Sequence, residues 1–159
     1  MCGIVGQFRT DGNHLEKSLI ENMCTALRHR GPDDQGFFFD GPVGLGMRRL
    51  SVIDLDGGQQ PMSNEDGTLQ VIFNGEIYNY QDLRQELLSN GHDLNTQSDT
   101  EVIVHLYEDY GLDCFSKLDG MFTIAIWDTR KEELVLARDK FGKKPLFYAK
   151  TDQGLSFSS

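Results

Sequence analysis

The second residue, Cys2, carries a thiol at a position where unusual chemistry becomes available. If Met1 is removed, Cys2 becomes N-terminal and bears a free α-amine beside the thiol. The pKa of an unperturbed α-amine is roughly 7.7–8.0, so near neutral pH part of it is unprotonated and can accept the thiol proton. Cys2 is therefore a candidate nucleophile with its own general base. The alternative is a buried structural cysteine.

Three further polar groups stand at the ends of expected strands or the starts of expected helices, where a rigid scaffold presents functional side chains. They are Arg49, the Asn74-Gly75 pair and Asp99. A guanidinium binds a carboxylate through paired hydrogen bonds, and a carboxylate pairs with an ammonium. An Asn side-chain N–H beside a Gly backbone N–H can form an oxyanion hole. With a thiol, this set suits a small zwitterionic amide. For Asp99 the alternative is an acid that stabilises the first turn of a helix.

Hydrophobic periodicity predicts the elements that position these groups. Strands are expected at residues 3–8, 35–39, 43–50, 69–73, 121–127, 134–137, 146–148 and 155–157. We expect helices at 15–28, between Asn79 and Gly91, and from Ser98 to Gly111, with Ser98 and Glu101 spaced as a capping box. We expect the 69–73 strand to end at Asn74, and the last third to form an antiparallel meander. The pattern predicts an α+β sandwich with helices outside two sheets.

Composition restricts the classes of function. The 159 residues form one domain, and 15 Lys and Arg against 25 Asp and Glu give a net charge of −10. Such a surface repels phosphate backbones and anionic lipids, so neither nucleic acid nor membrane is an expected partner. The three cysteines, Cys2, Cys24 and Cys114, include no CxxC pair, and no apolar run approaches 18 residues. We expect reduced thiols in the cytoplasm, with Cys24 in the core.

Other catalytic templates are missing from the sequence. It contains no GxxxxGK[ST], GxSxG or HExxH motif. Its four histidines, His14, His29, His92 and His105, are scattered, and His105 is interpreted as a structural residue within a helix. No metal site is expected.

The chain resembles the N-terminal glutaminase domain of glutamine-hydrolysing asparagine synthetases, which are class II glutamine amidotransferases. The shared motifs are MCGIVG at Met1, RHRGPD at Arg28, RRLSVIDL at Arg48, QPM at Gln60, FNGEIYNY at Phe73, SDTE at Ser98, LDGMFTIAIWD at Leu118 and RDKFGKKPLFY at Arg138. Each alone is weak, but eight in order over nearly the whole chain are specific. The resemblance implies a four-layer αββα sandwich of the N-terminal-nucleophile hydrolase type, with residues 1–159 as the amidotransferase domain.

The resemblance also implies catalytic roles. Cys2 would attack the side-chain carbonyl of L-glutamine, activated by its own α-amine. Asn74 and the backbone N–H of Gly75 would contact the substrate and hold the tetrahedral oxyanion. A glutamyl thioester would form, ammonia would leave, and water would release glutamate. No metal or organic cofactor is expected for this step.

Substrate recognition would rest on charged groups. Arg49 would bind the α-carboxylate of glutamine, and Asp99, helped by Glu76, would bind its α-ammonium. The backbone at Val52 and Ile53 would flank the bound amino acid. A second arginine, Arg48, departs from the usual family pattern, and it could compete with Arg49 or point to solvent.

In the resembled family the chain continues beyond this domain into an ATP-dependent synthetase domain, which is absent here. ATP and Mg²⁺ are expected only there, where ammonia would serve asparagine synthesis from aspartate. Met121 and the segment around Arg30 are predicted to face the ammonia tunnel between the domains. Expected partners are L-glutamine, the synthetase domain and, as a candidate assembly, a second copy of the chain.

Two alternatives remain open. One is an amidotransferase domain that supplies ammonia to another acceptor. The other is a non-catalytic module for docking or glutamine sensing. The presence together of Cys2, Arg49, Asn74, Gly75 and Asp99 favours a catalytic domain over such a module.

Overall fold

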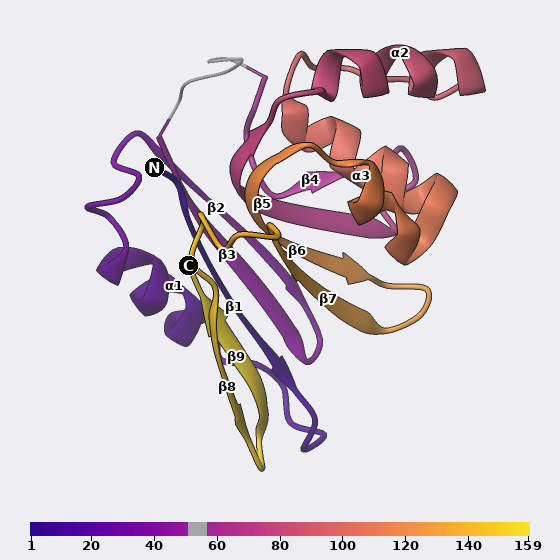
Figure 1. Cartoon of the computed structure of the whole chain (residues 1–159). Helices are drawn as coiled ribbons and strands as arrows, with labels where there is room; N and C mark the ends of the chain where they lie inside the picture. Colours follow the sequence, from indigo (N-terminus) through magenta and orange to yellow (C-terminus); the bar gives the residue numbers. More distant parts are fainter. Residues whose placement is uncertain (51–56) are drawn as a thin grey trace.

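Two antiparallel sheets pack face to face in the computed structural model, which describes residues 1–50 and 57–159 (Figure 1). The first sheet has the strand order β2-β3-β1-β9-β8, and the second has the order β4-β5-β6-β7. The strands are β1 (Gly3–Arg9), β2 (Asp34–Asp40), β3 (Val43–Arg49), β4 (Met62–Ser63), β5 (Leu69–Ile77), β6 (Gly120–Asp128), β7 (Glu133–Arg138), β8 (Phe147–Thr151) and β9 (Gly154–Ser158).

Helices cover the outer faces of both sheets (Figure 1). Helix α1 (Lys17–Ala26) lies on the first sheet, α3 (Asp99–Tyr110) lies on the second, and α2 (Tyr80–Asn90) packs against α3. The short 3₁₀ helix η1 (Gly111–Lys117) follows α3. The order helix, sheet, sheet, helix is the arrangement that the sequence predicted. None of the described helices is both long and apolar enough to cross a membrane.

The space between the sheets is filled by side chains that alternate inward along the central strands. They are Ile4, Val43, Leu45, Met47, Ile72, Ala125, Trp127 and Phe157. The indole Nε1 of Trp127 donates a hydrogen bond of 2.8 Å to Asp40 Oδ2, which joins β6 to the end of β2. The buried indole therefore keeps a partner for its N–H and links the two sheets.

Helix α1 packs closely on the first sheet because β3 carries glycine beneath it. A Cβ on Gly46 would lie 2.5 Å from Cys24 Sγ and 2.8 Å from Ile20 Cγ2. Cys24 is 1% exposed, and burial raises the pKa of its thiol to about 12. The prediction that Cys24 belongs to the core is confirmed.

The prediction that the strand ends at Asn74 was wrong. Strand β5 continues through Asn74-Gly75 to Ile77, and both residues pair with β6, opposite Thr123 and Phe122. A tight turn at Asn-Gly needs the following segment to fold back on the preceding strand. Here β6 already occupies that edge, and a side chain on Gly75 would overlap the backbone oxygen of Met121. Pairing with a distant strand therefore overrides the local turn preference.

The last third of the chain does not form a single meander. The hairpin β6–β7 belongs to the second sheet, whereas β8–β9 belongs to the first. Strand β9 pairs antiparallel with β1, with Ser158 opposite Val5. The segment between β7 and β8 carries the chain from one sheet to the other. Turn signals alone do not specify which sheet a hairpin joins.

The two later helices begin and end close to the predicted residues. Helix α2 follows Asn79 and ends at Gly91, whose φ of 96° is in the left-handed region that favours glycine. Ser98 caps α3 by accepting a hydrogen bond from Thr100 N. The capping box does not close among the described residues, because Glu101 accepts from the backbone N–H groups of residues 95 and 96 instead.

Asp139 organises the segment between β7 and β8. Its carboxylate accepts hydrogen bonds from the backbone N–H groups of Phe122, Phe141, Lys143 and Lys144, at 2.9 to 3.2 Å. Although burial opposes ionisation, these donors outweigh it and lower the pKa of Asp139. One ionised side chain therefore fixes the turn that carries Lys144, whose carbonyl oxygen accepts a hydrogen bond from Thr123 Oγ1 of β6.

We predict that Asp139→Asn lowers the free energy of unfolding by about 2–3 kcal/mol at pH 7, because an amide NH₂ faces donors that need an acceptor. The folded pKa lies below the unfolded one, so the contribution of Asp139 is present above the usual carboxyl pKa and is lost as pH falls through the folded value. Urea denaturation at pH 7 and in acid measures both effects.

The exposed Asp152 in the β8–β9 turn provides the control, since Asp152→Asn should change stability by less than about 0.5 kcal/mol. Equal effects of the two substitutions would contradict the role given to Asp139.

Candidate active site

A cavity of about 190 Å³ opens where β1 begins, β3 and β5 end, and α3 begins. That volume suits a ligand the size of one amino acid. Its described lining consists of Met1, Cys2, Arg49, Leu50, Gly58, Gln60, Phe73, Asn74, Gly75, Glu76, Ser98, Asp99, Thr100, Met121 and Lys144. Every predicted site residue that the structure describes borders this one cavity. Val52 and Ile53 lie outside the described residues.

The position of Cys2 follows from the pairing of β1 with β3, in which Gly3 lies opposite Arg48. One residue before Gly3, the Sγ of Cys2 accepts a hydrogen bond from Leu50 N at 3.5 Å and donates to Leu50 O at 3.7 Å. Arg30 Nε donates to the carbonyl oxygen of Cys2 at 3.2 Å. The thiol is partly exposed and borders the cavity, so Cys2 is not a buried structural cysteine.

Asn74 is 1% exposed, and its side-chain amide lies against Cys2. In the amide orientation that satisfies its neighbours, Asn74 Nδ2 donates to Cys2 O at 3.0 Å, and its Oδ1 accepts from Arg30 Nη2 at 3.3 Å. An amide nitrogen carries two N–H groups, so Nδ2 retains a second donor. Arg30 thus fixes both the backbone that bears the thiol and the amide beside it.

The open edge of β5 presents backbone donors to the cavity. Phe73 N donates to Gln60 Oε1 at 2.7 Å, and Ile77 N donates to Asp99 Oδ2 at 3.1 Å. Alternate N–H groups of a strand point to the same edge, so the N–H of Gly75 faces the same way. Gly75 itself borders the cavity. A bound ligand can therefore accept a hydrogen bond from Gly75, between two donors that the protein occupies itself.

The two consecutive arginines point to opposite faces of β3. Arg48 Nε donates to Gly31 O at 2.9 Å, and Arg48 Nη1 donates to Gln35 Oε1 at 2.7 Å. Arg48 is buried away from the cavity, so the expectation that it competes with Arg49 or points to solvent was wrong. Arg49, which is also buried, borders the cavity.

Asp99 carries a perturbed carboxyl group at the first position of α3. Burial raises its pKa to about 6, a rise that the nearby charge of Glu76 reinforces and that hydrogen bonds from backbone N–H groups, including Ile77, partly offset. Perturbed carboxyl groups of this kind concentrate at functional sites. A ligand ammonium beside Asp99 and Glu76 would favour the ionised form.

Sequence reasoning assigned no role to several of the lining residues, including the polar side chains of Gln60 and Lys144. Gln60 bridges β5 and α3, since its Oε1 accepts from Phe73 N and its Nε2 donates to Thr100 Oγ1 at 3.0 Å. Lys144, 7% exposed, reaches the cavity from the turn held by Asp139. Both residues lie within motifs, QPM and RDKFGKKPLFY, that the sequence analysis used only as support for the family resemblance. Those motifs were the one signal that could have pointed to these two residues.

Solved structures define the class of this fold. The chain matches the glutamine phosphoribosylpyrophosphate amidotransferase from Bacillus subtilis complexed with ADP and GMP, with a TM-score of 0.81 and 23% identity. The match covers 99% of this chain and 41% of that structure's chain. A structure described as the allosteric regulatory enzyme of purine biosynthesis matches with a TM-score of 0.82, also at 23% identity, over 99% of the chain and 42% of that structure's chain. The fold is the predicted α+β sandwich, in which two antiparallel sheets lie between layers of helices.

The family follows from the sequence comparisons. The family model of the glutamine amidotransferase domain matches residues 1–159, so the chain belongs to the glutamine amidotransferase domain family. It is 47% identical to asparagine synthetase [glutamine-hydrolyzing] 1 and 45% identical to asparagine synthetase [glutamine-hydrolyzing] 2, both from Bacillus subtilis (strain 168). All of this chain aligns with 26% and 21% of those relatives, so it spans about a quarter of their length or less. The predicted resemblance to glutamine-hydrolysing asparagine synthetases is confirmed.

We predict that Asp99→Asn stabilises the protein at neutral pH. A folded pKa of about 6 against a usual value of 3.8 means that the folded state holds the proton more tightly. Stability therefore falls as pH rises through that window, and the ionised carboxylate costs about 3 kcal/mol at pH 7. Asparagine keeps an acceptor for Ile77 N and removes the charge. Urea denaturation should show a gain of about 1–3 kcal/mol at pH 7 that disappears near pH 4.

Asp82 is the matched control, since it is also an acid in the first turn of a helix but is exposed. Asp82→Asn should lower stability by a few tenths of a kcal/mol through loss of the favourable dipole interaction. A loss of stability in Asp99→Asn at pH 7 would refute the cost assigned to its burial.

Proposed function

We propose that this chain hydrolyses the side-chain amide of L-glutamine to glutamate and ammonia, with Cys2 as the nucleophile. The observation that carries the proposal is that Cys2, Asn74, Gly75, Arg49 and Asp99 border one cavity of amino-acid size. Glutamine presents an amide, a carboxylate and an ammonium. The cavity offers a thiol with oxyanion donors, a guanidinium and an ionisable carboxyl.

The proposed reaction begins after removal of Met1, when the α-amine of Cys2 takes the thiol proton. Sγ then attacks the side-chain carbonyl carbon and forms a tetrahedral oxyanion. Asn74 Nδ2 and the backbone N–H of Gly75 donate hydrogen bonds to that oxyanion, each worth roughly 2.7–4 kcal/mol of barrier. The protonated amine gives its proton to the leaving nitrogen, so ammonia departs and a glutamyl thioester remains. Water, deprotonated by the same amine, hydrolyses the thioester to glutamate and restores the thiol.

Recognition of the amino-acid end rests on Arg49 and Asp99. Arg49 can hold the α-carboxylate through two parallel hydrogen bonds. Asp99, with Glu76 near it, can hold the α-ammonium, and the ligand's positive charge would offset the raised pKa of Asp99. Backbone contacts at Val52 and Ile53 belong to the same proposal.

The similarity to glutamine-hydrolysing asparagine synthetases supports a wider proposal. Residues 1–159 would act as the amidotransferase domain of a longer cytoplasmic enzyme whose ATP- and Mg²⁺-dependent synthetase domain converts aspartate to asparagine with the released ammonia. Met121, which borders the cavity, would face the path of ammonia to that domain. A homodimer is the proposed assembly. Supply of ammonia to a different acceptor, or a docking or sensing role without catalysis, is the competing hypothesis.

We predict that glutamate release from L-glutamine falls by at least about 1,000-fold in Cys2→Ala, because no other described group in the cavity carries a thiol. Glutamate is measured with the intact mass recorded on the same sample, and the active protein should lack one methionine. Thermal unfolding with and without glutamine shows whether Cys2→Ala still binds the substrate. No release from a protein with a free N-terminal Cys2, despite glutamine binding, would support the sensing hypothesis instead.

We predict that Arg49→Lys raises KM for glutamine by about 10–100-fold with a smaller effect on kcat, because lysine replaces a two-point contact with a single one. Arg48→Lys provides the contrast within the same strand. It should lower the thermal stability, since two hydrogen bonds of a buried guanidinium are lost, and leave KM within about a factor of three. The reverse pattern would assign carboxylate binding to Arg48.

A further inference from the structure

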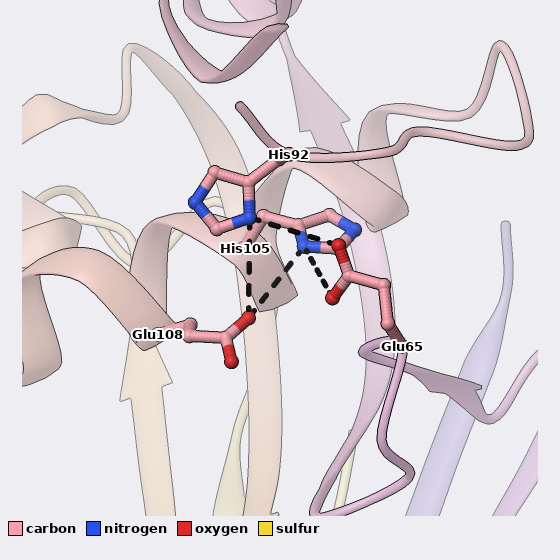
Figure 2. Close-up of side chains that lie close together, drawn as sticks. All are labelled: Glu65, His92, His105 and Glu108. Carbon is pink, nitrogen blue, oxygen red and sulfur yellow. Dashed lines mark ion pairs between the residues drawn. The ribbon is translucent and has the colours of Figure 1, made fainter. Parts of the chain in front are cut away.

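A second cluster of convergent polar side chains lies outside the cavity. It consists of Glu65, His92, His105 and Glu108, none of which borders the candidate active site (Figure 2). Glu65 comes from the turn between β4 and β5, and His92 follows the end of α2. His105 and Glu108 lie three residues apart on one face of α3. Three separate segments therefore deliver two imidazoles and two carboxylates to one point.

The facing atoms are closely spaced. His105 Nδ1 lies 3.5 Å from Glu65 Oε2 and 3.8 Å from Glu108 Oε2. His92 Nδ1 lies 3.8 Å from Glu65 Oε1 and 4.0 Å from Glu108 Oε2. One ligand atom from each residue falls within a span of 4.8 Å. Ligands at about 2.0–2.1 Å from a tetrahedral ion are about 3.3 Å apart, so small side-chain movements would close the set around one ion.

His92 is held by a carboxylate on its far side. Its Nε2 lies 2.9 Å from Asp109 Oδ1, and the other oxygen of Asp109 accepts from Asn90 Nδ2 at 3.2 Å. A proton on Nε2 leaves Nδ1 with a free lone pair that faces the cluster. Metal-binding histidines are usually oriented by such a carboxylate behind the ring.

The two glutamates are oriented in the same way. Asn64, which is 3% exposed, donates from Nδ2 to Glu108 Oε1 at 3.1 Å and leaves Oε2 facing the cluster. The backbone N–H of Asp93 donates to Glu65 Oε1 at 3.4 Å. Hydrogen bonds outside the cluster thus hold the carboxylates, while their remaining acceptor capacity points inward.

Two atoms that face the centre have no hydrogen-bond partner among the described residues. They are Nδ1 of His105 and Oε2 of Glu108. The side chain of His105 is 2% exposed, so solvent cannot readily supply the missing partner. An unpaired buried polar atom carries a desolvation cost that no hydrogen bond offsets. The two atoms therefore suit a group that accepts one lone pair from nitrogen and one from oxygen.

The charge of the cluster points to a cation. Glu65, Glu108 and Asp109 surround His92 and His105, whose ring centroids are 4.9 Å apart. A single divalent ion offsets the carboxylates and leaves both rings neutral, the form in which imidazole binds metals.

We infer that Glu65, His92, His105 and Glu108 form a four-coordinate site for a divalent transition-metal ion such as Zn²⁺. Two imidazole nitrogens and two carboxylate oxygens suit an ion of borderline softness. The ion would join the β4–β5 turn, the loop after α2 and the middle of α3. Because Asp99 begins the same helix, the site would also fix the helix that carries a residue of the candidate active site. This role is independent of the proposed glutamine hydrolysis.

Calorimetric titration of the whole chain with ZnCl₂ tests the inference, in the Cys2→Ala form so that the N-terminal thiol cannot bind the metal. The expected result is one Zn²⁺ per chain. At about a hundredfold excess over Kd, Zn²⁺ should raise Tm by about 5–10 °C. Replacing Zn²⁺ by Co²⁺ should give the visible absorption of tetrahedral Co²⁺ without a thiolate charge-transfer band.

His92→Gln and Glu108→Gln should each weaken Zn²⁺ binding by at least tenfold, on the scale of about 10–100-fold seen for disturbed metal sites. Both residues are partly exposed, so these variants avoid the risk that His105→Gln, in the core, fails to fold, and circular dichroism verifies their structure. His14→Gln, at an exposed histidine outside the cluster, should bind Zn²⁺ as tightly as the Cys2→Ala protein without this second substitution. The inference would be overturned if the Cys2→Ala protein failed to bind one Zn²⁺ per chain, or if all the variants bound Zn²⁺ equally well.

Discussion

The pairing register between β1 and β3 is the constraint on which the candidate active site depends. Gly3 lies opposite Arg48, so the residue before Gly3 meets the end of β3. There the Cys2 thiol exchanges hydrogen bonds with the backbone of Leu50. A slip by one residue would reverse the faces of β1 and carry its apolar side chains out of the space between the sheets. Burial of residues such as Ile4 therefore fixes where the thiol stands.

The second sheet completes the arrangement from the other side. Asn74 is locked by the pairing of β5 with β6 and by Arg30, which also holds the carbonyl of Cys2. Asp99 is held at the start of α3 by Ile77 N. Arg49, Asn74 and Asp99 thus sit on strands or a helix whose own packing is independent of any ligand, and Cys2 directly precedes β1. The raised pKa of Asp99 shows that this fixed arrangement lowers the stability of the fold, because an ionised carboxyl group is kept in a buried position.

Sequence reasoning could predict most of the elements and most of the site, because local periodicity and the family motifs report on both. It failed where the answer depends on long-range pairing. Asn74-Gly75 has the local character of a turn, yet β6 holds it in a strand. The sequence assigned carboxylate binding to Arg49 but left open where Arg48 points, which depends on the pleat of β3. His92 and His105 are 13 positions apart, and nothing in their spacing indicates that their rings meet.

The open edge of β5 has a further consequence for behaviour in solution. A strand edge with unpaired N–H groups is a template for a strand of another molecule, and such edges promote aggregation. Here side chains take the place of a neighbouring strand, since Gln60 and Asp99 occupy the donors on either side of Gly75. Among the described residues, the cavity opens between these two side chains. In the part of the chain that the structure describes, the side chains that cover this sheet edge thus also leave Gly75 facing the cavity between them, so protection from other copies of the chain and access for a ligand come from one arrangement.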